Sequence, residues 1–208
     1  MLTISVIDPV SYDITTKLIT YDTDSKAFTY ICDISDDHGY VKFVKSFGER
    51  KYSVVFDDLT FLYFEAATGN ITDNVKYDLP VIISYFPVDE NTALILSNDS
   101  CLYKIDISEK NVTAKLDINN DKIKTSSYDY SEFVYIPEKN IVILEWSDNG
   151  YVVDMETFEL MYSVDYYEDY IASNDCVIVK QHGHIGYYPL YTVEELAKKA
   201  ESYLGINN

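Results

Sequence analysis

Two histidines two residues apart are the sharpest candidate for metal chemistry in this sequence. His182 and His184 flank Gly183. In an extended segment their imidazoles would lie on one face, where neutral imidazoles can share zinc or copper. A closed site needs further ligands, and His38 is the one remaining histidine. We therefore expect a polar turn here, with no metal site and no cofactor.

Paired carboxylates are the second candidate for chemistry. They occur at Asp36-Asp37, Asp57-Asp58, Asp89-Glu90 and Glu168-Asp169. A glycosidase needs two acids across a cleft, one of them with a raised pKa, but 35 acidic residues produce such pairs by chance. The chain has no GxSxG motif, no phosphate-cradling glycine loop and no Cys/His catalytic setting. We therefore predict no catalytic residues and no enzymatic activity.

Tyrosines mixed with acids form two unusual stretches. The first reads SSYDYSE at 126–132, and the second reads DYYEDY at 165–170. Tyrosine gives a large contact area at low entropic cost, and acids beside it select Lys- or Arg-bearing partners. We predict that the partner-binding residues are Tyr128, Asp129, Tyr130, Asp165, Tyr166, Tyr167 and Asp169. The alternative is that these tyrosines begin or end strands and pack locally.

The charge of the chain restricts its partners. Its 35 acidic and 16 basic residues give a formal net charge of −19. Binding to nucleic-acid phosphates requires clustered Lys and Arg, and anionic membranes repel an acidic chain. We therefore expect no nucleic acid and no membrane partner, and we expect a basic protein partner. A charge that serves solubility alone is the alternative.

The cysteines and the first residues indicate the compartment. Cys32, Cys101 and Cys176 are far apart and odd in number, which favours buried thiols in a reducing compartment. The chain begins MLTISVIDPV, without a basic start or an apolar stretch of signal length. No run of 18 apolar residues is present. These features predict a cytoplasmic protein.

A strand, an acidic residue, a short turn and a second strand recur along the chain. The acidic residues are Asp8, Glu65, Asp106 and Asp154, separated by 57, 41 and 48 positions. A period near 40 to 50 residues with several short strands is typical of a β-propeller blade or a related β-repeat. We therefore treat residues 1–208 as a single β-repeat domain. Its expected units are an irregular region at about 1–51, then 52–79, 80–120, 121–167 and 168–191.

The repeated hairpin resembles the units of β-propeller proteins of the WD40-like and quinoprotein-like group. The resemblance covers about residues 52–191 and rests on strand order, period and the Val/Ile-Asp-turn-Thr pattern. It implies an all-β fold: a small propeller-like array of about four antiparallel β-sheet units with a C-terminal helix. A β-sandwich or an open curved β-array is the alternative. The Trp-Asp and Gly-His dipeptides of WD40 repeats are missing, so no functional residues carry over.

The last unit lacks a fourth strand, and a helix at 192–204 is expected in its place. Thr192 and Glu195 have the spacing of a capping box, and Gly205 is a natural stop. The apolar stripe consists of Val193, Leu196, Ala197, Ala200, Tyr203 and Leu204. We expect this stripe to pack against the sheets. A helix that binds a partner is the alternative.

Three functions from different classes remain. The first is a non-catalytic acidic protein-interaction module, for example an inhibitor or immunity-type protein that blocks a basic toxin or nuclease. The second is a carbohydrate-binding propeller-like protein that stacks sugars on aromatic rings. The third is a hydrolase with acidic residues in a central cleft. The Tyr/acid stretches favour the first.

Overall fold

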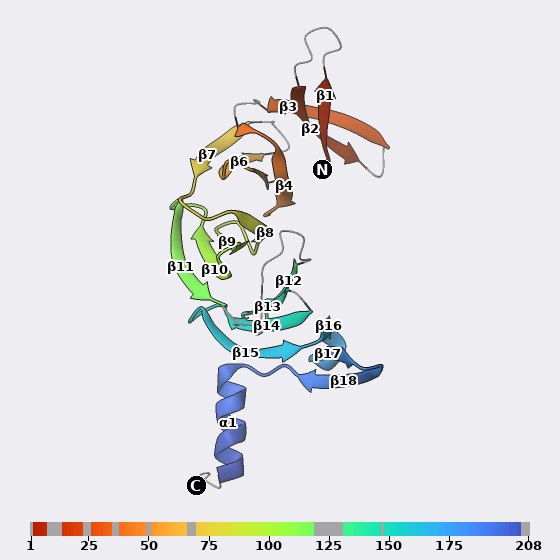
Figure 1. Ribbon diagram of the computed structural model, residues 1–208. Coiled ribbons are helices and arrows are strands. Elements are labelled where there is room, and N and C mark those ends of the chain that lie inside the picture. Colours follow the sequence, from red (N-terminus) through yellow and green to blue (C-terminus); the bar gives the residue numbers. More distant parts are fainter. Residues whose placement is uncertain are drawn as a thin grey trace. The chain divides into compact units, whose positions relative to one another are not determined.

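The computed structural model describes residues 2–7, 14–22, 26–34, 38–48, 51–65, 70–118, 131–146 and 148–204. In these ranges the chain forms antiparallel β-sheets followed by a C-terminal helix (Figure 1), which confirms the predicted all-β fold. The chain divides into two compact units. Unit 1 contains Met1–Asp99 and Tyr103–Thr113, and unit 2 contains Ser100–Leu102 and Ala114–Asn208.

Three sheets begin in unit 1. The first has the order β1-β2-β3, with strands β1 (Leu2–Ile7), β2 (Ile14–Asp22) and β3 (Ala27–Ile34). The second has the order β4-β5-β6-β7, with β4 (Val41–Ser46), β5 (Lys51–Phe56), β6 (Thr60–Glu65) and β7 (Ile71–Lys76). The third has the order β11-β10-β9-β8, with β8 (Ile82–Pro87), β9 (Thr92–Ser97), β10 (Cys101–Asp106) and β11 (Asn111–Asp117). The described part of the region expected to be irregular thus contains one whole sheet and strand β4.

Aromatic side chains fill the core of unit 1. The ring of Phe61 lies edge-on to Tyr77 and Tyr85, with centroids 5.0 and 5.5 Å away. Tyr85 is 1% exposed, and its hydroxyl donates to Ser53 Oγ at 2.9 Å. The buried hydroxyls thus bond within the core, where an unpaired polar group would be costly. The abundance of tyrosine in the sequence therefore serves packing here.

The recurrent acidic residue has a structural role in the hairpin turns. The Asp106 carboxylate accepts from the backbone N–H of Glu109 at 2.9 Å. The Asp154 carboxylate likewise accepts from the N–H groups of Glu156 and Thr157 at 2.8 and 2.9 Å. A short carboxylate at the end of a strand therefore fixes the turn that follows it, which explains why the repeat is visible in the sequence.

Unit 2 contains two sheets. The first has the order β12-β13-β14-β15, with β12 (Ser131–Ile136), β13 (Ile141–Trp146), β14 (Asn149–Asp154) and β15 (Glu159–Asp165). The second has the order β16-β17-β18, with β16 (Tyr167–Ile171), β17 (Cys176–Gln181) and β18 (His184–Pro189). In the described residues after β18 the chain forms helix α1 (Val193–Leu204). The predicted C-terminal helix is confirmed.

The two sheets of unit 2 share one hydrophobic core. Its members come from both sheets and are Ile136, Ile141, Ile143, Val152, Val164, Tyr167, Val177, Val179 and Leu190. Along β13 the residues alternate, so Ile141 and Ile143 face this core, and Glu145 is next on the same face. Burial of the aliphatic side chains stabilises the unit by roughly 1.5–3 kcal/mol for each residue.

Helix α1 begins at the predicted capping box. The Glu195 N–H donates to Thr192 Oγ1 at 3.2 Å, and the Thr192 N–H donates to Glu195 Oε2 at 2.7 Å. Lys139 anchors the start of the helix, because its ammonium lies 3.0 Å from Glu195 Oε2 and 2.6 Å from Asp175 Oδ2. Burial opposes the charge of Lys139, but the two carboxylates raise its pKa. The capping box and this ion-pair network fix where α1 leaves the sheet.

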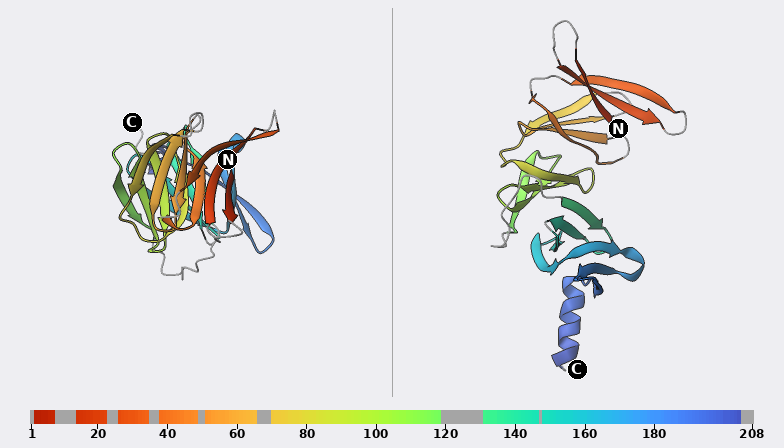
Figure 2. Two further views of the ribbon diagram at one scale, coloured as in Figure 1. Left: turned by 90° about the horizontal axis from the view of Figure 1, so that it is seen from above. Right: turned by 45° about the vertical axis from the view of Figure 1, so that its right-hand side comes forward.

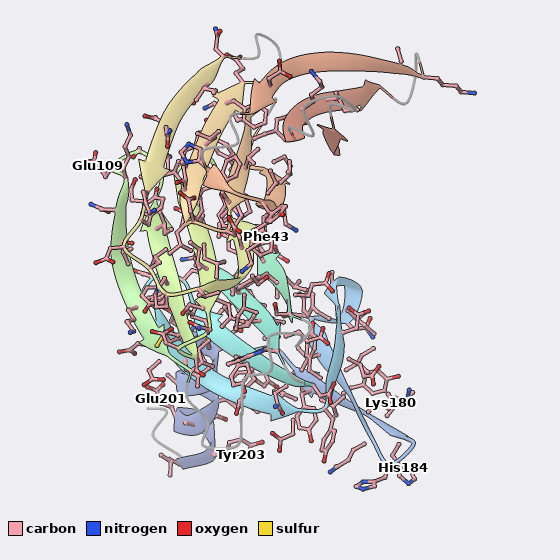
Figure 3. The ribbon with its side chains drawn as sticks, turned by 45° about the horizontal axis from the view of Figure 1, so that its top comes forward. Phe43, Glu109, Lys180, His184, Glu201 and Tyr203 are labelled. Carbon is pink, nitrogen blue, oxygen red and sulfur yellow. The ribbon has the colours of Figure 1, made fainter. Side chains whose placement is uncertain are left out.

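The expected packing of the apolar stripe is corrected by the structure. No residue of α1 is buried, and Val193, Leu196, Tyr203 and Leu204 are 50%, 38%, 82% and 71% exposed. Figures 2 and 3 show α1 extending away from the last sheet, with Tyr203 near its far end. The stripe has helical spacing, but spacing does not reveal whether a neighbour covers it. In the described part of the chain, no helix has the length and hydrophobicity needed to cross a membrane.

Removal of residues 193–208 is expected to change the melting temperature by less than about 4 °C, the shift for about 1 kcal/mol in a chain of this size. The reason is that α1 buries no side chain. Leu144→Ala, at a side chain that is fully buried, is the control and should cost about 2–5 kcal/mol. Thermal unfolding followed by circular dichroism measures both. A truncation as damaging as Leu144→Ala would contradict the exposed position of the helix.

Candidate functional site

The second Tyr/acid stretch forms the end of one strand, a turn and the start of the next strand. Asp165 ends β15, Tyr166 is the single turn residue, and Tyr167 begins β16. Tyr166 has a φ of 59° and is 46% exposed, while Asp165 and Asp169 are exposed. Three of these predicted residues therefore reach solvent. The first stretch, with Tyr128, Asp129 and Tyr130, lies outside the described residues.

Backbone hydrogen bonds hold the turn at Tyr166. The Lys180 N–H donates to the Tyr166 carbonyl, and the Tyr167 N–H donates to the Asp148 carbonyl, both at 3.0 Å. A left-handed conformation costs a residue with a Cβ roughly 1–2 kcal/mol. The two bonds link the turn to β17 on one side and to the turn between β13 and β14 on the other.

Tyr167 has a different role from the one predicted. Its side chain is 5% exposed and belongs to the core between the two sheets. A Cβ at Gly150 would lie 2.7 Å from the Tyr167 ring, so the ring occupies the space that a side chain at residue 150 would need. Strand patterning cannot distinguish this tyrosine from its exposed neighbours. Tyr167 positions β16, whereas Tyr166 offers a surface ring.

The Tyr167 hydroxyl is buried and has no hydrogen-bond partner among the described residues. Burial raises its pKa, and the carboxylates of Asp169, Glu145 and Glu132 raise it further. The side chain of Tyr167 therefore remains neutral near these negative charges.

Five carboxylates, which we call the acidic cluster, are near enough to interact electrostatically at Glu145. They belong to Glu132, Glu145, Asp148, Glu168 and Asp169. Glu132 and Glu145 are cross-strand partners, so their side chains project from the same face of the sheet, and like charges in that arrangement repel. The next residue in the row is Gly150, above which the Tyr167 ring lies. The sheet therefore brings together charges that local strand stability disfavours.

The other four carboxylates of the cluster all affect the pKa of Glu145. Burial raises its pKa above the ordinary 4.5, and Glu132, Asp148, Glu168 and Asp169 raise it further. Each of these groups adds negative charge, so a cation placed among them would be favoured. Within the described ranges no three His, Cys, Asp or Glu residues are arranged to hold a metal ion.

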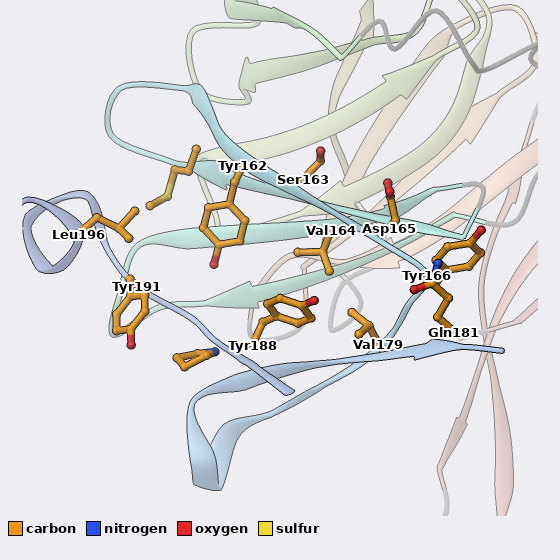
Figure 4. A pocket seen from close by; sticks show the side chains of 12 residues that line it. Tyr162, Ser163, Val164, Asp165, Tyr166, Val179, Gln181, Tyr188, Tyr191 and Leu196 are labelled. Carbon is orange, nitrogen blue, oxygen red and sulfur yellow. The ribbon is translucent and has the colours of Figure 1, made fainter. Parts of the chain in front are cut away.

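A groove of about 600 Å³ adjoins the turn at Tyr166 (Figure 4). Its lining combines tyrosines with aliphatic side chains and a single carboxylate: Met161, Tyr162, Ser163, Val164, Asp165, Tyr166, Val179, Gln181, Tyr188, Pro189, Tyr191 and Leu196. Two of the predicted residues, Asp165 and Tyr166, thus border it. One wall is β15, and the other is the β17–β18 hairpin.

The histidine pair lies at the tip of this hairpin. His182 and Gly183 have φ angles of 50° and 80° and form the turn between β17 and β18, while His184 begins β18. Both histidines are exposed, and Figure 3 shows His184 at the outer end of the hairpin. The predicted polar turn is confirmed.

A second cavity, of about 280 Å³, lies in unit 1. It is the candidate in this unit for a catalytic pair of carboxylates. Its carboxylates are Glu65, Asp73 and Glu90. Lysines neutralise two of them, because Lys51 bonds to Glu90 and Lys110 bonds to Asp73. Neither this cavity nor the groove contains Glu132 or Glu145. A hydrolytic pair of acids facing a cleft is not supported in either place.

Comparison with known proteins supports the fold. No protein-family model matches the chain, and no curated protein matches its sequence. The chain is similar to the β-propeller domain of Cps50 (Swd1) from Myceliophteria thermophila, with a TM-score of 0.53 and 12% identity. That match covers 86% of this chain and 61% of the other. Apo AztD from Citrobacter koseri also matches, with a TM-score of 0.53, 9% identity and coverage of 72% and 41%.

These similarities confirm the propeller-like array of β-sheet units and favour it over a sandwich. The chain spans less than two thirds of either structure's length. Identity this low is evidence for the fold alone, so the functional residues must be argued from the site.

Glu145, Asp148, Glu132 and Glu168 were not among the predicted site residues. A usable signal exists for Glu145, which is the one charged residue in the apolar run IVILEW at 141–146. A charge on the core-facing side of a strand requires a specific reason. Its proximity to Glu168 and Asp169 depends on how β16 packs, which no local pattern reveals.

Glu145→Gln is expected to raise the melting temperature at neutral pH by about 1–4 °C, since removing a like-charge cross-strand pair releases about 0.2–1 kcal/mol. The folded-state pKa of Glu145 is raised. Folding therefore gains from its protonation below pH 4.5 and loses that gain as the pH rises through the folded-state value. The advantage of the variant should accordingly vanish below about pH 4.5. Melting curves from pH 4 to 8 measure it. An advantage independent of pH would contradict the electrostatic origin.

Proposed function

We propose that this chain is a non-catalytic protein-interaction module that binds a basic segment of a partner protein. The binding surface consists of the acidic cluster and the adjoining Tyr166 and Asp165. The observation that carries the proposal is the cross-strand pairing of Glu132 with Glu145 next to the acids of β16. Like charges directly opposite each other are unfavourable, so a cationic side chain of the partner would be attracted to this group of carboxylates.

Tyr166 supports the proposal by its position. Its ring is exposed although its backbone is fixed by the hydrogen bond from Lys180. A rigid exposed tyrosine beside carboxylates has the composition of interface hot spots, which are rich in Tyr and often meet Arg. Tyr128, Asp129 and Tyr130 lie outside the described residues, and we propose them as further partner-binding residues because they have the same composition.

The finer version of the proposal is an inhibitor or immunity-type protein that blocks a basic toxin or nuclease in the cytoplasm. The support is chemical. A net charge of −19 steers a basic protein toward the chain from a distance, and a carboxylate cluster that mimics phosphate charge would occupy its nucleic-acid site.

Carbohydrate binding is the second candidate, and the tyrosine-lined groove favours it. Tyr162, Tyr166 and Tyr188 border the groove, and aromatic faces are suited to sugar rings. A glycan array discriminates this candidate, because salt should hardly affect sugar binding, whereas it weakens binding of a basic protein.

The variant Glu145→Gln/Glu168→Gln/Asp169→Asn should slow association with the basic partner about tenfold at low salt and flatten its salt dependence. The control is Glu109→Gln/Glu156→Gln/Glu159→Gln, which removes the same charge from exposed positions outside the cluster. The partner is captured from the native cell on immobilised protein, purified, and measured by surface plasmon resonance at two salt concentrations. Equal association rates for cluster and control variants, or a captured partner that is not basic, would overturn the proposal.

A further inference from the structure

Among the described residues, the last sheet of unit 2 ends in a strand with a neighbour on one side only. Strands β7, β11 and β15 each add a fourth strand to their sheets, but β18 has β17 as its one neighbour in the described chain. After β18 the described chain turns into α1 and adds no strand. The outer edge of a strand carries a row of N–H and C=O groups that can pair with another segment.

The register identifies the backbone groups at this edge. The Leu190 N–H donates to the Asp175 carbonyl at 2.9 Å. In an antiparallel pair the bonded positions alternate, so the backbone groups of Tyr188 and Gly186 face β17. Those of Ile185 and Tyr187 face outward. Pro189 also falls on the outward side, where its missing N–H leaves no unpaired donor within the sheet.

Edge strands usually avoid pairing by lysines, prolines, inward charges or bulges. Of these features β18 has a proline, Pro189, at its last position. β18 reads HIGYYP, and its register with β17 is regular over all six residues. Ile185, Tyr187 and Tyr188 are 60%, 62% and 53% exposed. An edge of this composition favours an added strand.

The groove lies where the inward side chains of such a strand would go. Val179 and Tyr188 line one wall, and Tyr162, Val164 and Tyr166 line the other. Residues of an added strand level with Gly186 and Tyr188 would point into this space, because cross-strand neighbours share a face. The groove can therefore accept every second side chain, and its lining favours apolar ones.

One end of the groove lies at the turn between β15 and β16. Asp165 and Tyr166 border that end, and Lys180 bonds to the Tyr166 carbonyl. Glu168 and Asp169 follow within three residues of the turn. Lys180 pairs with Ile185 and therefore faces away from the groove. A strand antiparallel to β18 would run from Pro189 toward His184 and would leave the groove on the side of Asp165 and Tyr166.

We propose that β18 receives an extended segment of the partner as a fourth, antiparallel strand. Its alternate apolar side chains enter the groove, and Lys or Arg residues that follow the strand reach the acidic cluster. The role of the Lys or Arg residues that follow the strand rests on the proposed function, whereas the addition of the strand to β18 does not. The structure thus specifies a recognition sequence of alternating apolar residues followed by basic ones, bound by β-augmentation.

Fluorescent peptides of ten residues test this inference on the full chain. Each peptide alternates Thr with Val, Ile, Phe or Tyr over seven residues and ends in Arg-Lys-Arg, and a matched set ends in Ser-Asn-Ser. The protein variants are Tyr187→Thr and Tyr187→Pro, which both lose the ring, while the proline alone loses the outward N–H. Anisotropy gives the affinity, and hydrogen exchange reports the amides of Ile185 and Tyr187.

At least one basic-tailed peptide should bind, protect both amides and bind Tyr187→Pro about tenfold more weakly than Tyr187→Thr. The neutral tail should weaken binding with the amides still protected. Equal affinity for the two Tyr187 variants, no change in amide exchange, or no binding by any peptide would overturn the strand addition. If the neutral-tailed peptides bind equally well and protect the amides of Ile185 and Tyr187, the strand addition is supported, and the proposed preference for a basic partner is contradicted. A dimer of the protein alone that Tyr187→Pro dissociates would make a second copy the occupant and overturn the proposal.

Discussion

The contact between the Tyr167 ring and Gly150 is the constraint on which the site in unit 2 depends. A side chain at residue 150 would displace the ring, and without the ring the first strand of the last sheet would lose its place over β14. This one packing contact puts the carboxylates of Glu168 and Asp169 next to Glu145. Tyr167 also belongs to the core that includes Val164 of β15 and Val179 of β17, and both of these residues line the groove. The same buried tyrosine therefore supports both the charged and the apolar parts of the surface.

The candidate site lies where the sheets depart from the usual patterns of apolar core residues and protected edges. Along β13 the core face reads Ile141, Ile143 and then Glu145, so the hydrophobic pattern stops one position before the end of the strand. Glu132 places a second carboxylate beside it, and β18 leaves an apolar edge that no other described strand covers. Proteins tend to keep such departures from self-consistency at functional sites. A partner with a basic residue and an extended strand would satisfy both departures at once.

Features that depend on local sequence patterns could be predicted from the sequence. The acidic residue that ends a strand, such as Asp106 or Asp154, binds the turn that follows, so the hairpins and their period were predictable. The capping box of α1 was predictable for the same reason. The burial of Tyr167 and the exposure of the apolar stripe of α1 were not predictable. The spacing of residues shows which side chains share a face, but it does not show what covers that face. Sequence analysis did not predict the acidic cluster, because its members come from three strands and a turn that meet through tertiary packing.

The pKa of Glu145 in the free and the bound protein is the most direct measure of the central claim. The captured basic partner is added to protein labelled with ¹³C at the glutamate carboxyls, and the titration of Glu145 is followed by NMR. We expect a pKa above the ordinary 4.5 in the free protein and a clear fall on binding, because a nearby cation favours the carboxylate. An unperturbed pKa in the free protein, or a raised value that the partner leaves unchanged, would contradict the account.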